Sequence, residues 1–144
     1  MSNDLFGRML TLSAQGFQCA QIMMLLALES DGKEDPDLVR AVGGLNMGFT
    51  DSTGPCGALS GGCCFLSYYT GKGDTGELED PAFREILAEF TSWFRAEYGQ
   101  LYGGFMCNDI LERNPDNIPK RCPDIIQSTY LKAVEILGDH GVEV

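Results

Sequence analysis

The sequence predicts an all-α protein, a compact bundle of about six to seven helices with no sheet. Three observations lead to this fold class. Apolar residues recur at helical spacing in most segments, turns rich in glycine, proline and acidic residues separate these segments, and no stretch alternates as a strand would. At 144 residues the chain is long enough to bury a core without disulfides or metals. We therefore expect a single domain over residues 1–144.

Four helices are expected in the first half of the chain. Asp35 is a typical N-cap residue and Pro36 a typical first helical residue, which together set the start of the third. The second helix is apolar on most sides, so it belongs in the centre of the bundle. A strand pair is the alternative for the fourth, because the letters CCFL alone could form a strand. In order, the helices cover about 3–14, about 17–29, Pro36 to the segment GGLNMG, and 55–69.

Three more helices are expected in the second half. Asp80–Pro81 starts the clearest of them, whose apolar residues repeat at helical spacing until Gly99. A short helix covers about 105–113, and the last begins near Cys122–Pro123, with the cysteine as N-cap. The aromatic stripe of the first of these helices is interpreted as core rather than as a cofactor site. Its residues expected to be buried are Phe83, Leu87, Phe90 and Phe94.

Composition and charge exclude several classes of function. The chain has 21 acidic and 10 basic residues and a net charge of −11, so neither nucleic acid nor an anionic membrane is an expected partner. No window reaches the roughly 20 apolar residues of a membrane span, and the start MSNDLFGRML lacks the features of a signal peptide. We therefore expect a cytoplasmic protein. His140 is the sole histidine, which argues against a His-rich zinc site and a Ser-His-Asp triad.

The six cysteines are the main functional signal. In a reducing compartment such cysteines are more often catalytic, redox-sensing or metal-binding than structural disulfides. No C-x-x-C pair occurs, which excludes a thioredoxin-type motif and a zinc ribbon. Cys63 and Cys64 lie inside the fourth helix and are interpreted mainly as packing residues, with Cys63 the more reactive of the two. The other four are expected at the starts of four different helices: Cys19, Cys56, Cys107 and Cys122.

A helix start is a favourable place for a thiolate. Unpaired N–H groups and a partial positive charge of about half a unit gather there, so we expect the cysteine pKa to fall below its free value of about 8.5. Such a thiolate suits disulfide exchange and metal ligation equally well. We expect the four cysteines to converge, with at least two Cα atoms within the roughly 7 Å limit for bridging. The alternative is that they are inert, small hydrophobic residues.

The small residues around Cys56 indicate close packing. Gly57 and Gly61 are four residues apart, as are Ala58 and Gly62, so two adjacent strips of the fourth helix are almost free of side chains. Such strips let another helix or a loop approach the backbone closely, although each helical glycine costs about 1 kcal/mol against alanine. Close approach would bring Cys56 within reach of a cysteine on the neighbouring element. Tight packing without chemistry remains the alternative.

The segment CGALSG, from Cys56 to Gly61, matches the CGAxxG motif of the redox-active protein family known as C_GCAxxG_C_C, which this sequence resembles over nearly its whole length. Members have about this length and four shared cysteines, one before the motif, one in it and two after it. The segment AVGGLNMG is also similar to the family's pattern. The resemblance implies a redox role for Cys19, Cys56, Cys107 and Cys122. Because some related domains occur with iron–sulfur or haem proteins, it also keeps cluster binding open, but without C-x-x-C-H covalent haem attachment is excluded.

Three functions follow from these patterns. The leading one is a thiol–disulfide redox protein, which would make the chain a thiol–disulfide oxidoreductase with Cys56 as nucleophile. The resolving thiol would be Cys19, Cys107 or Cys122. The alternative is an electron-transfer protein in which the same four cysteines hold an iron–sulfur cluster or, less favourably, zinc. The third is a helical scaffold with inert cysteines. The expected partner is an unidentified redox protein, and the sequence leaves homo-oligomerisation open.

Overall fold

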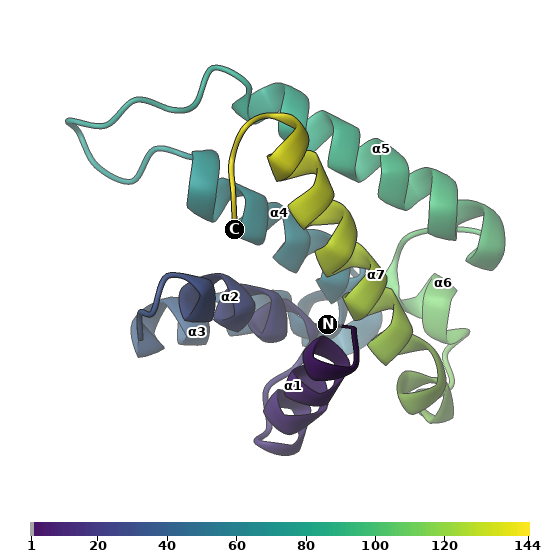
Figure 1. Cartoon of the computed structure of the whole chain (residues 1–144). Helices are drawn as coiled ribbons and strands as arrows, with labels where there is room; N and C mark the ends of the chain where they lie inside the picture. The colour runs from purple at the N-terminus through teal and green to yellow at the C-terminus, as the bar shows by residue number, and fades with distance from the viewer. Residues whose placement is uncertain (1) are drawn as a thin grey trace.

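The computed structural model describes residues 2–144, with side chains from residue 4 onward, and it confirms the all-α class (Figure 1). Within that range the chain forms seven α-helices and three short helical turns, and an isolated bridge between Pro55 and Met106 is its sole β-type pairing. The helices are α1 Ser2–Ala14, α2 Cys19–Ser30, α3 Pro36–Val42, α4 Gly57–Thr70, α5 Phe83–Tyr102, α6 Cys107–Leu111 and α7 Ile118–Asp139. The short turns are η1 Gly43–Leu45, η2 Gly48–Ser52 and η3 Pro115–Asn117.

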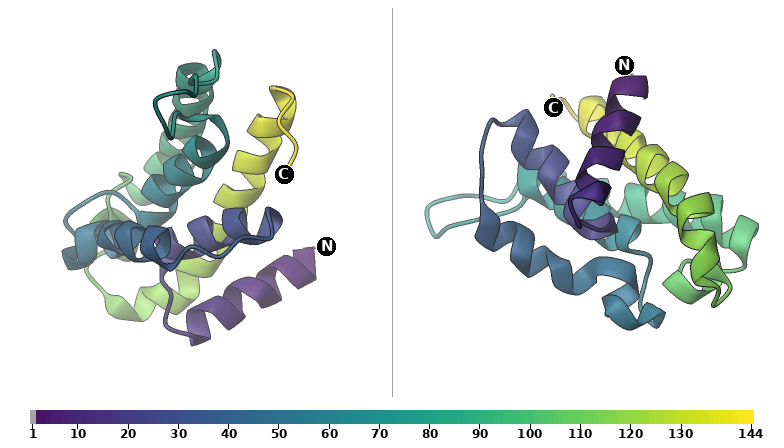
Figure 2. Two further views of the ribbon diagram at one scale, coloured as in Figure 1. Left: turned by 90° about the vertical axis from the view of Figure 1, so that its left-hand side faces the viewer. Right: turned by 90° about the horizontal axis from the view of Figure 1, so that it is seen from below.

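The centre of the bundle is the contact between α2 and α4. Helix α2 packs along α4, and α4 in turn packs against α5 and α7, while α1 lies against α7 and α2 (Figure 2). Ala20, Met23 and Ala27 of α2 have no solvent-exposed surface. The expected central position of the second helix is therefore confirmed.

The glycines of α4 explain how two helices approach so closely. A Cβ atom at Gly61 would lie 2.7 Å from the Cα of Ala20 in α2, and one at Gly62 would overlap the ring of Phe90 in α5. Atoms other than hydrogen do not approach that closely without bonding, so only glycine fits at either position. The segment is a continuous helix, and the alternative of a strand pair is wrong. The expected close contact at Gly61 is confirmed.

Helix α3 begins as the sequence indicates, and α5 ends later than expected. Asp35 caps α3, because its side chain accepts a hydrogen bond of 3.1 Å from the Leu38 N–H. Helix α5 does not stop at Gly99 but continues to Tyr102. Its C-cap is Gly103, which has φ 79°, a left-handed conformation that glycine adopts without strain. Gly99 lacks such a conformation and remains helical, so the expected end at Gly99 is wrong.

The aromatic stripe of α5 forms much of the core. Phe90 and Phe94 are completely buried, as expected, but Phe83 and Leu87 are only half-buried. The positions that reach deeper are Ile86 and Tyr98. The buried face of α5 is therefore rotated slightly about the helix axis relative to the expected face.

Helix α7 begins earlier than expected, so Cys122 is not its N-cap. The preceding turn η3 is capped by the Asn114 side chain and leads directly into α7 at Ile118. Pro119 takes the start position, where a missing N–H costs nothing, and Pro123 lies inside the helix. Cys122 is therefore the fifth residue of α7, in its second turn. Cys122–Pro123 has the pattern of a helix start, but Pro119, four residues earlier, already occupies the first turn of α7.

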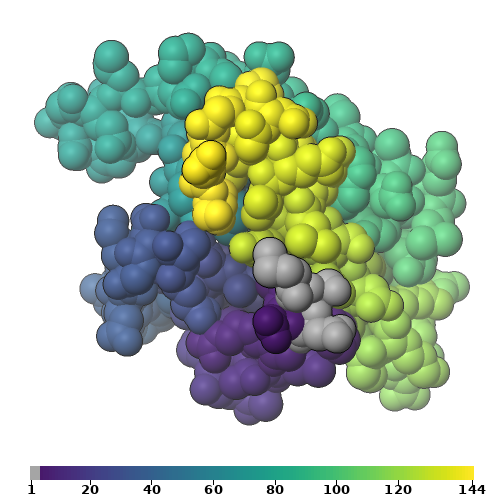
Figure 3. Space-filling view, viewed as in Figure 1, coloured from purple at the N-terminus to yellow at the C-terminus, as the bar shows by residue number. Residues whose placement is uncertain are grey.

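On the face shown in Figure 3, α1 lies beside α7 and α2. None of the helices in residues 2–144 combines the length and apolar character needed to cross a bilayer.

Candidate functional site

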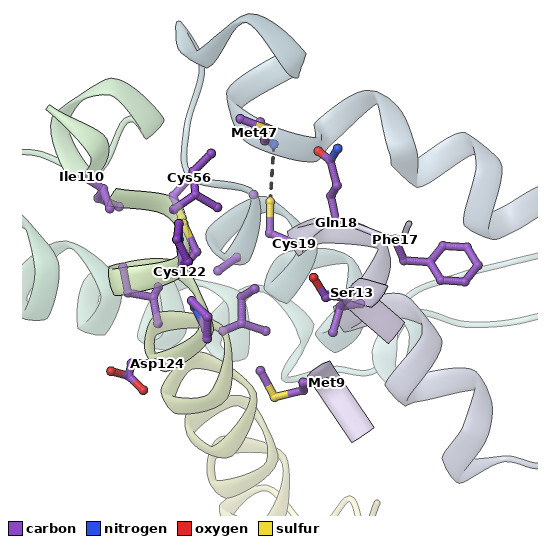
Figure 4. Close-up of a pocket in the computed structure, with 18 of the residues that line it drawn as sticks. Met9, Ser13, Phe17, Gln18, Cys19, Met47, Cys56, Ile110, Cys122 and Asp124 are labelled. Carbon is purple, nitrogen blue, oxygen red and sulfur yellow. Dashed lines mark hydrogen bonds between the residues drawn. The ribbon is translucent and has the colours of Figure 1, made fainter. Parts of the chain in front are cut away.

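The four cysteines that the sequence places near helix starts all line one cavity of about 700 Å³ (Figure 4). The cavity lies among α1, the starts of α2, α4 and α6, and the first half of α7. Cys56 and Cys107 are buried, and Cys19 and Cys122 are half-buried. All four are free thiols. Four separate helices thus bring their cysteines to one place, while Cys63 and Cys64 do not line this cavity.

Cys19 is positioned by the loop between α3 and α4. It is the first residue of α2, and its sulfur accepts a hydrogen bond of 3.4 Å from the Met47 N–H, drawn as a dashed line in Figure 4. The buried side chain of Asn46 accepts hydrogen bonds of 3.1 and 3.3 Å from the Ala20 and Gln21 N–H groups. Asn46 therefore caps α2 from a distant part of the chain and holds the loop against the start of the helix.

The backbone after Met47 is strained beside the site. Four non-glycine residues within six positions have positive φ, which is uncommon for residues with a side chain. Such strain persists only where the surrounding structure fixes it. Gly48 lies among them, and a Cβ atom there would come 2.7 Å from the Cβ of Cys107. The four residues are Met47, Phe49, Thr50 and Ser52.

A short backbone pairing joins the starts of α4 and α6. Two hydrogen bonds of 2.9 Å flank the bridge between Pro55 and Met106, one donated by the Cys56 N–H and one by the Cys107 N–H. Side chains alternate along extended backbone, so the two cysteines that follow the bridged residues point to the same side. That side is the cavity.

The small residues of the CGALSG segment place Cys19 next to Cys56. The Cys19 sulfur lies directly against Gly57, where a Cβ atom would overlap it. Because Gly57 has no side chain, the first residue of α2 reaches the N-terminal residues of α4. The Cys19 sulfur thus lies against the residue that follows Cys56, on the neighbouring element where the sequence predicts a second cysteine.

A family model described as "Putative redox-active protein (C_GCAxxG_C_C)" matches residues 17–136. This interval covers more than half of the chain and contains all four cavity cysteines. The chain belongs to the C_GCAxxG_C_C family. A search of curated proteins and a search of solved structures found no match.

The family description gives a redox class and names neither a substrate nor a cofactor. Helix α1 lies outside the matched interval, yet it contributes Phe6, Met9, Leu10 and Ser13 to the cavity of this C_GCAxxG_C_C protein. The cavity is therefore lined partly by the family region and partly by the helix that precedes it.

Burial controls the acidity of Cys56. It raises the pKa of this thiol to about 12, and the neighbouring Cys19 adds to the rise. Hydrogen bonds from the Ala58 and Leu59 backbone, at the start of α4, lower the pKa but do not offset the loss of solvent. The expectation that a helix start lowers the pKa of Cys56 is therefore wrong, because desolvation exceeds the effect of the N–H groups.

The same cause acts on two other family cysteines. Burial raises the pKa of Cys122 to about 12, and nearby Cys19 and Cys107 contribute in the same direction. Burial also raises the pKa of Cys19, against hydrogen bonds from the backbone of Met47 and Ala20. A negative charge on one of these sulfurs would thus raise the pKa of the others, which is a second indication that they lie close together.

Cys63 and Cys64 have a different setting on α4. Both are half-buried and pack against the hydrophobic core, as the interpretation of packing residues expects. Burial, with a contribution from Cys64, raises the pKa of Cys63 to about 11, and Arg95 opposes the rise. Burial also raises the pKa of Cys64. Burial thus raises the pKa of both Cys56 and Cys63, so the helix start does not make Cys56 a thiolate at neutral pH.

Metal binding was the alternative use of the four cysteines. Within the described part of the chain, no group of three or more His, Cys, Asp or Glu side chains has an arrangement that could hold a metal ion. The iron–sulfur and zinc alternatives therefore have no preformed ligand set, and they stay predictions.

Sequence reasoning missed Asn46 and the strained loop that follows it. The letters GGLNMG were interpreted as the end of the third helix, but they also hold the cap of the second. An asparagine within a glycine-rich segment is a typical source of side-chain bonds to backbone N–H groups. That signal could have suggested a cap, but not for which helix.

Proposed function

We propose that this C_GCAxxG_C_C protein is a thiol–disulfide redox protein whose redox centre is the cavity lined by Cys19, Cys56, Cys107 and Cys122. The observation that carries the proposal is the convergence of these four free thiols, from four different helices, on one cavity. Inert cysteines that merely fill a core have no reason to share one cavity surface. The family's description as redox-active supports the same class of function.

Cys19 and Cys56 are the first pair that we expect to react. The Cys19 sulfur lies against Gly57, the residue next to Cys56, and Cys19 is the thiol whose charge acts most strongly on Cys56. Oxidation forms the S–S bond between the two sulfurs and transfers two electrons to the oxidant, while both thiol protons leave. The protonated thiols and the disulfide are both neutral, so neither redox state places a net charge in the cavity.

The test is to oxidise the reduced protein with diamide, an uncharged thiol oxidant, and to map disulfides by mass spectrometry of its peptides. We expect a Cys19–Cys56 disulfide that dithiothreitol reverses. Cys56→Ser should abolish it, and the matched variant Cys63→Ser on the same helix should not. Cavity thiols that stay free, or that bond only between molecules, would contradict the proposal.

A visible spectrum and metal analysis of anaerobically purified protein distinguish the thiol–disulfide function from iron–sulfur cluster binding. Colourless, metal-free protein that forms the internal disulfide supports the thiol mechanism. Coloured protein with stoichiometric iron, whose four cysteines alkylate only after the iron is removed, would replace it with the iron–sulfur function.

A further inference from the structure

The inner sulfurs of the cavity are out of reach of another protein. Cys56 is 8% exposed and Cys107 is 7% exposed. Disulfide exchange requires a thiolate to attack a sulfur of the partner's disulfide directly, so both sulfurs must meet. A disulfide held on the surface of a folded partner cannot meet a sulfur at the inner end of this cavity. Cys19 and Cys122 are half-buried, but an oxidant that attacks Cys56 or Cys107 directly must be small enough to enter the cavity.

The cavity lining selects for an apolar and uncharged molecule. Most of its side chains are apolar, and the described lining contains one cationic and one anionic residue, Lys120 and Asp124, both exposed. A charged compound such as glutathione disulfide would lose its hydration on entry without gaining a partner for each charge. Apolar residues that line the cavity include Phe6, Met9, Leu10, Ile22, Ile110 and Ile126.

The size of the cavity and its opening fit an organic ligand. About 700 Å³ lies within the usual range of small-molecule sites. The exposed members of the lining mark where it opens: Leu10 and Ser13 on α1, Gly16 and Gln18 in the turn before α2, and Pro119, Lys120 and Asp124 on α7. A ligand would therefore pass between α1 and the first turns of α7 and meet the buried sulfurs of Cys56 and Cys107 at the inner end.

We propose that the oxidant of this redox centre is a small, uncharged quinone that enters the cavity between α1 and α7, in place of a partner protein. The inference rests on the proposed thiol–disulfide function and names its substrate class. One sulfur of the pair adds to a quinone ring carbon, and its proton goes to a ring oxygen. The second sulfur then attacks the first. The S–S bond forms, the S–C bond breaks, and the second proton goes to the other ring oxygen, leaving a disulfide and a hydroquinone.

A quinone suits this cavity better than a one-electron oxidant does. It accepts both electrons and both protons of the thiol pair, so reactants and products are neutral and no charge remains inside the apolar cavity. Burial raises the pKa of both Cys19 and Cys56, so the two thiols of the pair carry both protons at neutral pH. A one-electron acceptor would leave those protons to be expelled through an apolar lining.

The first experiment compares two oxidants on the folded and the urea-unfolded protein. The probes are duroquinone and glutathione disulfide, each mixed anaerobically with reduced protein, and the readouts are hydroquinone formed and thiols lost. Unfolding exposes the same cysteines, so it controls for the intrinsic reactivity of each oxidant. We expect folding to slow the oxidation of the thiols by glutathione disulfide at least a hundredfold more than their oxidation by duroquinone. Duroquinone should give one hydroquinone for every two thiols lost.

The second experiment changes the opening of the cavity. Leu10 on α1 and Leu131 on α7 are 47% and 49% exposed, but only Leu10 lines the cavity. Leu10→Lys should therefore lower the rate of oxidation by duroquinone at least fivefold, and the matched Leu131→Lys should leave it unchanged. Equal rates in the two variants, or equal slowing of both oxidants by folding, would overturn the inference.

The outcomes separate this inference from the function on which it rests. If diamide forms the Cys19–Cys56 disulfide and duroquinone does not, the quinone inference fails and the thiol–disulfide function stands. If neither oxidant forms a disulfide among the cavity cysteines, both fail. If duroquinone forms it and Leu10→Lys slows the reaction, both are supported.

Discussion

Helix α4 connects two cysteine regions that differ in how they are built. At its start, Cys56 shares a cavity with thiols from α2, α6 and α7. About two turns later, Cys63 and Cys64 lie on one helix and pack against the core, away from that cavity. The first region exists only where four helices meet, whereas the second would be present on any isolated α4.

The comparison shows that acidity does not identify the functional thiols. Burial raises the pKa of Cys56 to about 12 and that of Cys63 to about 11, so both regions hold protonated thiols at neutral pH. Cys56 differs from Cys63 because it lines a cavity large enough for a ligand together with three further cysteines. Shared access, rather than the state of a single thiol, therefore marks the candidate site.

The largest expected effect that sharpens this comparison is on thiol reactivity. A thiol with a pKa near 12 is about a thousandfold less ionised at pH 8 than a free cysteine, so Cys56 should react with iodoacetamide about a thousandfold more slowly than a free cysteine. Cys63 should react about tenfold faster than Cys56. Mass spectrometry of the peptides over time measures both rates. Faster labelling of Cys56 would show that the N–H groups outweigh burial after all.

The next effect breaks the cavity while leaving the Cys63–Cys64 region in place. Gly61→Ala adds a Cβ atom 2.7 Å from the Cα of Ala20, which cannot move without shifting α2. We expect the free energy of unfolding in urea to fall by about 3 kcal/mol, and the Cys19–Cys56 disulfide to form less readily.

Gly99→Ala on α5 is the control for this substitution. Its added Cβ atom meets nothing within 4 Å, so it should stabilise the protein by up to about 1 kcal/mol. If Gly61→Ala proves as stable as Gly99→Ala, α2 and α4 are not in the close contact described.

A smaller effect is expected on the pH dependence of stability. The pKa of Cys56 is raised in the folded protein, so above about pH 9 its thiol ionises in the unfolded chain but not in the folded one. Its contribution to stability is complete below that pH and is lost as pH rises toward 12. Between pH 7 and 10, reduced protein should therefore lose about 2 kcal/mol more than Cys56→Ser does. Parallel urea titrations that show the same loss in both proteins would contradict the raised pKa.

The smallest effect is expected from the second region. Replacing both Cys63 and Cys64 with alanine removes half-buried sulfurs that only pack, so the free energy of unfolding should fall by about 1 kcal/mol. Diamide should still form the cavity disulfide at the wild-type rate. A slower rate would mean that this pair takes part in the redox chemistry and that the two regions are not separate.

The sequence alone determined the class of fold and much of its local structure. Apolar segments bounded by turn residues predicted α1, α2 and α4 nearly in full. Asp35–Pro36 predicted the start of α3, and the four-residue spacing of Gly57 and Gly61 predicted a close helix contact. These features depend on interactions within a few turns of chain. The order of four cysteines and the CGALSG motif were also enough to indicate the family.

Only the tertiary structure decided the properties that depend on distant segments. Asn46 caps α2 from 26 residues away. Cys122–Pro123 has the pattern of a helix start, but η3 leads into α7 at Ile118, so Pro123 lies inside the helix. The pKa of Cys56 is raised, although its place at a helix start predicts a lowered value, for the same kind of reason. The helix start that lowers it is local and visible in the sequence, but the burial that raises it comes from atoms of other helices, whose positions no local pattern contains.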